Sequence, residues 1–187
     1  AGELARAGRA AEPFPAAIAT TWLHVTEDRA AAERMLTEGI DLINGMVEGV
    51  SGVRLGIHLC RGNNVGMWMA SGGYDFIAQA LFERATAFDA FFLEYDDARS
   101  GSFEPLSQVP DDKQVVLGLV STKKAEVETP EELIARIEEA ARLVPREQLA
   151  LSTQCGFASV ADGNPISEEI EEDKLRLVAN VARAAWG

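Results

Sequence analysis

Four short runs of apolar residues occur along the chain, at positions 53–60, 90–95, 114–120 and 149–152. The first run is rich in branched residues and shows little alternation between apolar and polar positions, which is typical of a strand covered on both faces. The other three have the length of short strands and end beside polar residues. The pattern therefore predicts four strands of a buried sheet.

Apolar residues at helical spacing separate these runs, over residues 27–47, 74–85, 130–143 and 167–186. The clearest local signal is a capping box, in which Thr129 is the N-cap, Pro130 takes the first helical position and Glu132 completes the box. Pro145 ends that helix, and Ser167 is placed to cap the last one. The sequence therefore predicts the order helix, strand, helix, strand, long loop, strand, helix, strand, helix.

Alternation of strands and helices indicates a parallel sheet with helical crossovers. Four such strands fit either a small doubly wound sheet or half of an eight-stranded barrel, because both place their chemistry at the C-terminal ends of the strands. We assign residues 27–187 to this α/β domain and residues 1–26 to an N-terminal extension or linker.

Composition narrows the class of protein. The chain has 187 residues, 47% of them hydrophobic, which is enough for a sizeable core in one domain. A net charge of -13 argues against binding to nucleic acid or to an anionic membrane, since both need clustered basic residues. We find no apolar run of membrane-spanning length and no signal-peptide pattern, so we expect a cytoplasmic protein.

Side chains that bind metals cluster at the predicted strand ends. His58 and Cys60 are two residues apart on one strand, so both face the same side, while Glu94 and Cys155 end or follow two other strands. One histidine, two cysteines and one carboxylate suit zinc. Each residue also has an ordinary structural interpretation: a core histidine, a solvated carboxylate, or buried small cysteines.

Three nearby polar residues are weaker candidates for substrate binding. Asn63 follows the His-x-Cys pair, and its alternative role is ordinary turn chemistry. Asp96 and Arg99 follow the second strand and are candidates to contact a polar substrate, with a surface ion pair as the alternative.

Several short motifs in this order resemble the C-terminal catalytic part of the cobalamin-independent methionine synthase family. They are IHLCRGN at 57–63, LEYD at 93–96, FEPL at 103–106, VLGLV at 116–120 and LSTQCGF at 151–157. The resemblance implies a (β/α)8 barrel, of which this chain is the C-terminal half. It also implies Zn2+ as the cofactor, held by His58, Cys60, Glu94 and Cys155.

The same resemblance implies an enzyme that transfers a methyl group from methyltetrahydrofolate to the thiol of homocysteine, giving methionine. Short single-barrel members of the family are similar, as are relatives that alkylate coenzyme M with an epoxide, so alkylation of another thiol is the alternative. An inactive zinc-binding fragment and a metal-free α/β domain are further alternatives.

A half-barrel would leave two parallel edges unpaired, a condition that natural sheets avoid. We therefore expect the other half of the barrel to come from the same polypeptide, from a second chain or from a second copy. The remaining partners that we expect are small molecules, a thiol and a methyl or alkyl donor.

Overall fold

The computed structural model describes residues 28–67, 72–158 and 160–187, and the extension expected at 1–26 lies outside these ranges. The main elements are α2 (Arg29–Met46), β1 (Gly56–Leu59), α3 (Ala78–Arg84), β2 (Ala90–Glu94), β3 (Gln114–Val120), α4 (Pro130–Ala140), β4 (Leu149–Thr153) and α5 (Glu168–Trp186). Short 3-10 turns occur at Ala98–Ser100, Glu104–Gln108 and Arg146–Gln148.

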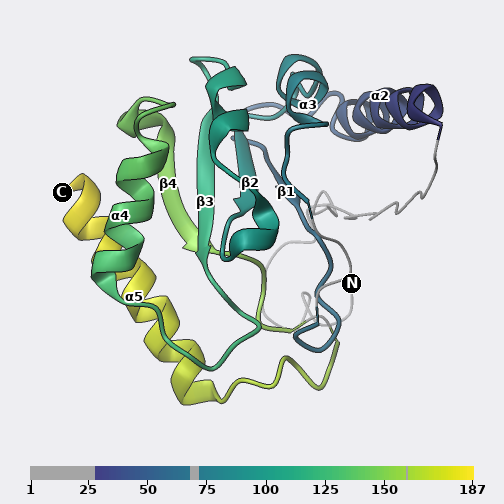
Figure 1. Cartoon of the computed structure of the whole chain (residues 1–187). Helices are drawn as coiled ribbons and strands as arrows, with labels where there is room; N and C mark the ends of the chain where they lie inside the picture. The colour runs from purple at the N-terminus through teal and green to yellow at the C-terminus, as the bar shows by residue number, and fades with distance from the viewer. Residues whose placement is uncertain (1–27, 68–71, 159) are drawn as a thin grey trace.

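The four strands form one sheet in the order β1-β2-β3-β4, and all neighbours are parallel (Figure 1). Each strand therefore lies beside the next one along the chain, joined by a crossover that returns to the same end of the sheet. The C-terminal ends of all four strands consequently lie at the same end of the sheet. The predicted alternating α/β architecture is confirmed.

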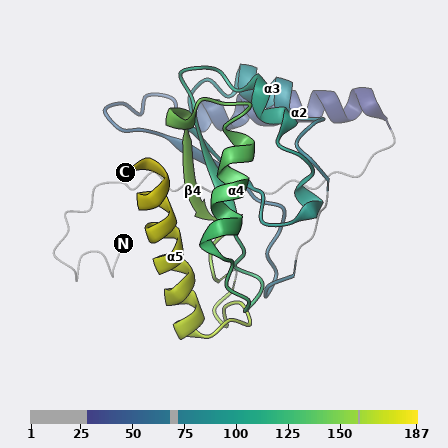
Figure 2. The same cartoon turned by 60° about the vertical axis from the view of Figure 1, so that its left-hand side comes forward.

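Helices cover one face of the sheet and bury its apolar residues. Phe91 and Leu93 of β2 and Val115 and Leu117 of β3 are almost fully buried in this layer. Helix α4 packs on β3 and α5 packs on β4, with the two helices in contact along this side (Figure 2). Helix α3 and the longer α2 contact each other nearer β1 and β2 (Figure 1).

The opposite face of the sheet carries a row of side chains in register: His58, Phe92 and Val116. Phe92 is 37% exposed, whereas Phe91, its neighbour on the helix-covered face, is fully buried. The helices therefore leave this second face partly open. The candidate metal ligands lie at the C-terminal ends of its strands.

The first strand is shorter than the sequence predicts. It begins at Gly56 instead of residue 53, and Val53 is 62% exposed. Gly52 has a φ of 75°, which places a turn immediately before Val53. The apolar run in the sequence therefore starts before the strand does, because Val53 is apolar but lies beside a turn.

Two polar features fix the helices around the sheet. The capping box at the start of α4 is present, with Thr129 and Glu132 each bonded to the backbone of the other, as predicted. In α5, the fully buried Lys174 donates a hydrogen bond of 2.9 Å to Glu128 and another to the carbonyl of Glu126. Lys174 therefore ties α5 to the loop that follows β3.

Candidate metal centre

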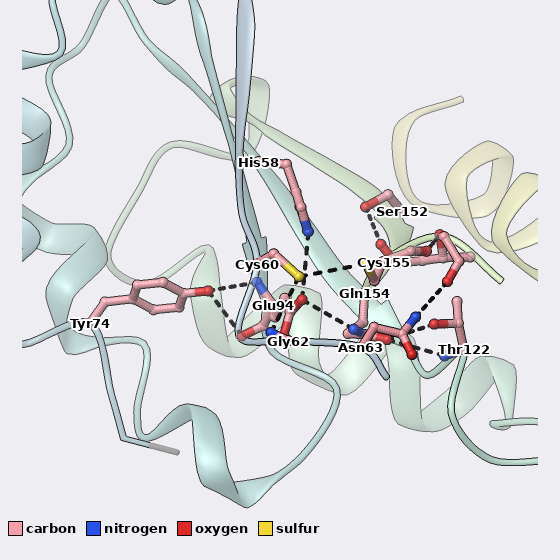
Figure 3. A network of polar contacts seen from close by, with 12 residues as sticks. His58, Cys60, Gly62, Asn63, Tyr74, Glu94, Thr122, Ser152, Gln154 and Cys155 are labelled. Carbon is pink, nitrogen blue, oxygen red and sulfur yellow. Dashed lines mark hydrogen bonds and ion pairs between the residues drawn. The ribbon is translucent and has the colours of Figure 1, made fainter. Parts of the chain in front are cut away.

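The structure brings the four predicted ligands together at the C-terminal edge of the sheet (Figure 3). His58 comes from β1, Cys60 follows it, Glu94 ends β2 and Cys155 lies two residues beyond β4. One ligand atom from each residue can be chosen so that all lie within 4.8 Å of one another. Side chains that are up to 97 residues apart in sequence thus converge on one point.

The spacing of these atoms fits a tetrahedral zinc ion. Cys60 Sγ and Cys155 Sγ are 3.9 Å apart, and two sulfurs bound to one zinc at about 2.3 Å are separated by about 3.8 Å. His58 Nε2 and Glu94 Oε1 are 3.5 Å apart, against about 3.4 Å for nitrogen and oxygen ligands. His58 Nε2 is also buried without a hydrogen-bond partner. The donor set and its geometry therefore fit the metal.

The electrostatics of the cluster favour thiolate. The hydrogen bond between the two thiols, together with burial, raises the pKa of Cys60, whereas the same bond and the neighbouring His58 lower the pKa of Cys155 to about 4. Burial lowers the pKa of His58, but its contacts with Cys155 and Glu94 outweigh this and raise it to about 9. These contacts favour a negative charge on the pair of sulfur atoms, and a bound metal would displace the proton of the imidazole, because a ligating histidine is neutral.

Neighbouring residues hold Glu94 in place. Its side chain accepts a hydrogen bond of 3.1 Å from Gln154 Nε2, and its backbone nitrogen donates one of 2.8 Å to the hydroxyl of Tyr74. Gln154 is itself fixed, because its Oε1 accepts from the backbone nitrogen and the hydroxyl of Thr122 (Figure 3). On the other side of the cluster, the backbone nitrogen of Gly62 donates to Cys60 Sγ.

Sequence reasoning did not single out Tyr74, Thr122 or Gln154. Gln154 had a usable signal, since an amide side chain directly before a candidate ligand at a strand end is well placed to orient a neighbour. Tyr74 and Thr122 gave none, because their roles depend on contacts across 20 and 32 residues of sequence.

Close approach of the turn after β4 to strands β3 and β2 brings Glu94 and Cys155 together. Gly118 of β3 pairs with Glu94 on one side and with Ser152 on the other. A Cβ atom at Gly118 would lie 2.8 Å from Gln154 Cα and 2.9 Å from the carbonyl oxygen of Leu93. Glycine therefore permits the turn after β4 to pass close to β2.

The weaker candidates have different surroundings. Asn63 bridges two loops, donating to the carbonyl of Gly156 at 3.0 Å and accepting from the backbone nitrogen of Gly66. Arg99 forms a bidentate ion pair with Asp97. Asp96 is partly buried beside the cluster, and its Oδ2 has no hydrogen-bond partner. Substrate binding by these three residues stays a prediction.

The fold and the site together define a class of domain. It is a parallel α/β domain with a cluster of His, Cys, Glu and Cys at its strand ends. The chain matches the family model for the catalytic domain of cobalamin-independent synthase over residues 67–182, which is more than half its length. The chain belongs to this family.

The curated relatives are much longer than the segment that this chain matches. Two uncharacterized proteins of Bacillus subtilis strain 168, YxjG and YxjH, are each 50% identical over 131 residues, which is 70% of this chain and 34% of each relative. The chain therefore spans about a third of the length of these relatives.

Solved structures show the same fold. A structure of the putative vitamin-B12-independent methionine synthase from Listeria monocytogenes has a TM-score of 0.64 and 31% identity, covering 90% of this chain and 44% of its own. A B12-independent methionine synthase from Shewanella sp. W3-18-1, in complex with selenomethionine, has a TM-score of 0.66 and 20% identity, covering 81% and 44%. The four parallel strands and their helices are thus half of a (β/α)8 barrel. No helix in the described part of this chain is long and apolar enough to span a membrane.

Proposed function

We propose that residues 27–187 form the C-terminal half of a zinc-dependent methyltransferase barrel. The reaction is transfer of the methyl group of methyltetrahydrofolate to the thiol of homocysteine, which gives methionine and tetrahydrofolate. The observation that carries this proposal is the spacing of the four ligand atoms of His58, Cys60, Glu94 and Cys155, in a chain of the cobalamin-independent synthase family.

Each residue of the site has a definite task in this proposal. His58, Cys60, Glu94 and Cys155 hold the metal, which when bound lowers the pKa of a substrate thiol and keeps its sulfur as a nucleophilic thiolate. The backbone of Gly62 stabilises the charge on Cys60 through its N–H group. The remaining supporting residues orient the Glu94 carboxylate.

The rest of the barrel supplies surfaces that this half lacks. β1 and β4 are the edge strands of the described sheet. We propose that the other half of the barrel pairs with these edges, from the same polypeptide, a second chain or a second copy. The solved neighbours support this arrangement, since the chain covers 44% of each.

The function is tested on the natural polypeptide that carries this sequence, loaded with zinc. We expect it to convert homocysteine and methyltetrahydrofolate labelled with 13C at the methyl carbon into labelled methionine, detected by mass spectrometry. Coenzyme M with an epoxide is the second substrate pair. Turnover of that pair alone would replace the proposed substrates, and turnover of neither by protein that contains zinc would contradict the transferase.

Replacing Gln154 with alanine is expected to weaken zinc binding by about ten- to a hundred-fold, the usual effect of removing a hydrogen bond that orients a ligating side chain. Affinity is measured by competition with a chromophoric chelator. Gln148→Ala is the matched control, because Gln148 bonds the carbonyls of Pro110 and Lys113 at the other end of β4. Equal losses in the two variants would show that Gln154 has no specific role at the metal.

A further inference from the structure

Two side-chain polar atoms beside the cluster are shielded from solvent and have no hydrogen-bond partner among the described residues. Lys123 Nζ and Asp96 Oδ2 are both shielded from solvent, and neither makes a hydrogen bond within the part of the chain that the structure describes. Buried polar groups are nearly always hydrogen-bonded, and a buried unpaired charge is costly. Such atoms are therefore candidates to bind a ligand.

Both groups lie at the edge of the sheet that carries the metal cluster. Asp96 is two residues beyond β2 and Lys123 is three residues beyond β3, and these strands are neighbours in which Glu94 pairs with Gly118. The positive charge of Lys123 stabilises the ionised forms of Glu94 and Asp96, yet Nζ bonds to neither carboxylate. The ammonium thus lies near the metal ligands with its hydrogen-bonding capacity unused.

The backbone around Lys123 is fixed on both sides. The carbonyl of Thr122 accepts a hydrogen bond of 2.8 Å from Asn164, and the backbone nitrogen of Lys123 donates to Ser121 Oγ. The backbone nitrogen of Ser121 donates in turn to Glu128. These bonds fix the backbone at Lys123, whose Nζ is shielded from solvent, in contrast to Lys124, which is exposed.

We propose that Lys123 binds the acid group of the thiol substrate. The proposal rests on the function proposed above and adds a specificity residue to it. In homocysteine the carboxylate lies three carbons from the sulfur, and in coenzyme M the sulfonate lies two carbons away. A thiol whose sulfur is at the cluster therefore carries its acid group into the neighbourhood of Lys123, where a charge-assisted hydrogen bond forms.

The methyl donor is a poorer fit to the same lysine. The carboxylates of a folate are separated from the methyl carbon by the whole pterin and aminobenzoate, so they do not lie beside the metal when the methyl group does. A neutral thiol is also disfavoured, because it leaves the buried ammonium unpaired.

The test is calorimetric binding of thiols to the zinc-loaded protein, in pairs that differ in the acid group. Coenzyme M is compared with 2-mercaptoethanol, and homocysteine with 3-aminopropane-1-thiol, which is homocysteine without its carboxylate. We expect the wild-type protein to bind the acidic member of at least one pair about ten-fold more tightly. The pair that shows the preference identifies the acid as carboxylate or sulfonate.

Lys123→Met, compared at full zinc loading, is expected to abolish that preference while leaving the affinity for the non-acidic thiol unchanged. Lys124→Met is the matched control and keeps the preference, and Lys123→Arg keeps most of it because the charge remains. A preference that persists in Lys123→Met would overturn the proposal. Equal weakening of both thiols in this variant would also overturn it, by assigning Lys123 a structural role. Failure of every thiol to bind zinc-loaded wild-type protein would instead refute the proposed function, and the substrate role of Lys123 with it.

Discussion

Cys60→Ser lowers the zinc content of the purified protein from about one equivalent to less than about a tenth, because a serine hydroxyl stays protonated where a thiol ionises and binds zinc. The loss is expected to be severe, since Cys60 and Cys155 supply both sulfur ligands, at a separation of 3.9 Å. Zinc is measured by atomic emission after dialysis against a weak chelator. We expect Cys155→Ser to behave in the same way.

Ser152→Ala is the matched control for the cysteine variants. Its hydroxyl lies close to the site but donates to the carbonyl of Thr153, so its removal leaves all four ligand atoms in place (Figure 3). Full zinc occupancy in Cys60→Ser would contradict the metal centre. It would support the alternative interpretation that the two cysteines are ordinary buried residues of a metal-free α/β domain.

Gly118→Ala is expected to destabilise the protein by about 3 kcal/mol, at the upper end of the usual cost of inserting a methyl group into a packed interior. The new Cβ would lie 2.8 Å from Gln154 Cα and within 3.1 Å of two carbonyl oxygens, and backbone atoms cannot turn aside as a side chain can. We expect weaker zinc binding as well, because Glu94 and Cys155 are carried by the segments that must separate. The measurements are urea unfolding and a zinc competition titration.

Gly39→Ala tests whether glycine replacement alone has this effect. Gly39 lies inside α2, and a Cβ atom there would have no neighbour within 4 Å. Alanine favours a helix by about 1 kcal/mol over glycine, so this variant should be as stable as the wild type or more stable. If Gly118→Ala unfolds at the same urea concentration as Gly39→Ala, the strands can separate at Gly118 without cost.

Local patterns predicted much of the architecture because they reflect local causes. The capping box at Thr129 depends on residues three apart, and the structure contains it as predicted. The apolar runs gave the four strands and their parallel arrangement, since strand length and crossover helices are visible in the sequence. The exception is the start of β1, where Val53 continues the apolar run but is exposed beside a turn.

The candidate site was predictable to the extent that it follows strand ends. All strands of one parallel sheet present their C-terminal residues at the same end, so His58, Cys60 and Cys155 could be expected on that side of the sheet, although β1 and β4 are not adjacent. The choice of Glu94 over Asp96 and Asp97 was less determined, because all three carboxylates lie at or just beyond the end of the same strand. The structure distinguishes them by surroundings: Glu94 is 3.5 Å from His58 Nε2, whereas Asp97 is paired with Arg99.

The sequence by itself determined the elements, their parallel order, the family and the four residues that could hold a metal. The tertiary structure decided the distances among those four, the hydrogen bonds of Tyr74, Thr122 and Gln154 that support Glu94, and the position of an unpaired Lys123 beside them. The physical reason for this division is the distance along the sequence over which each interaction acts. Periodicity and capping act over a few residues, whereas these contacts join residues 20 to 97 apart and exist only once the sheet has set its register.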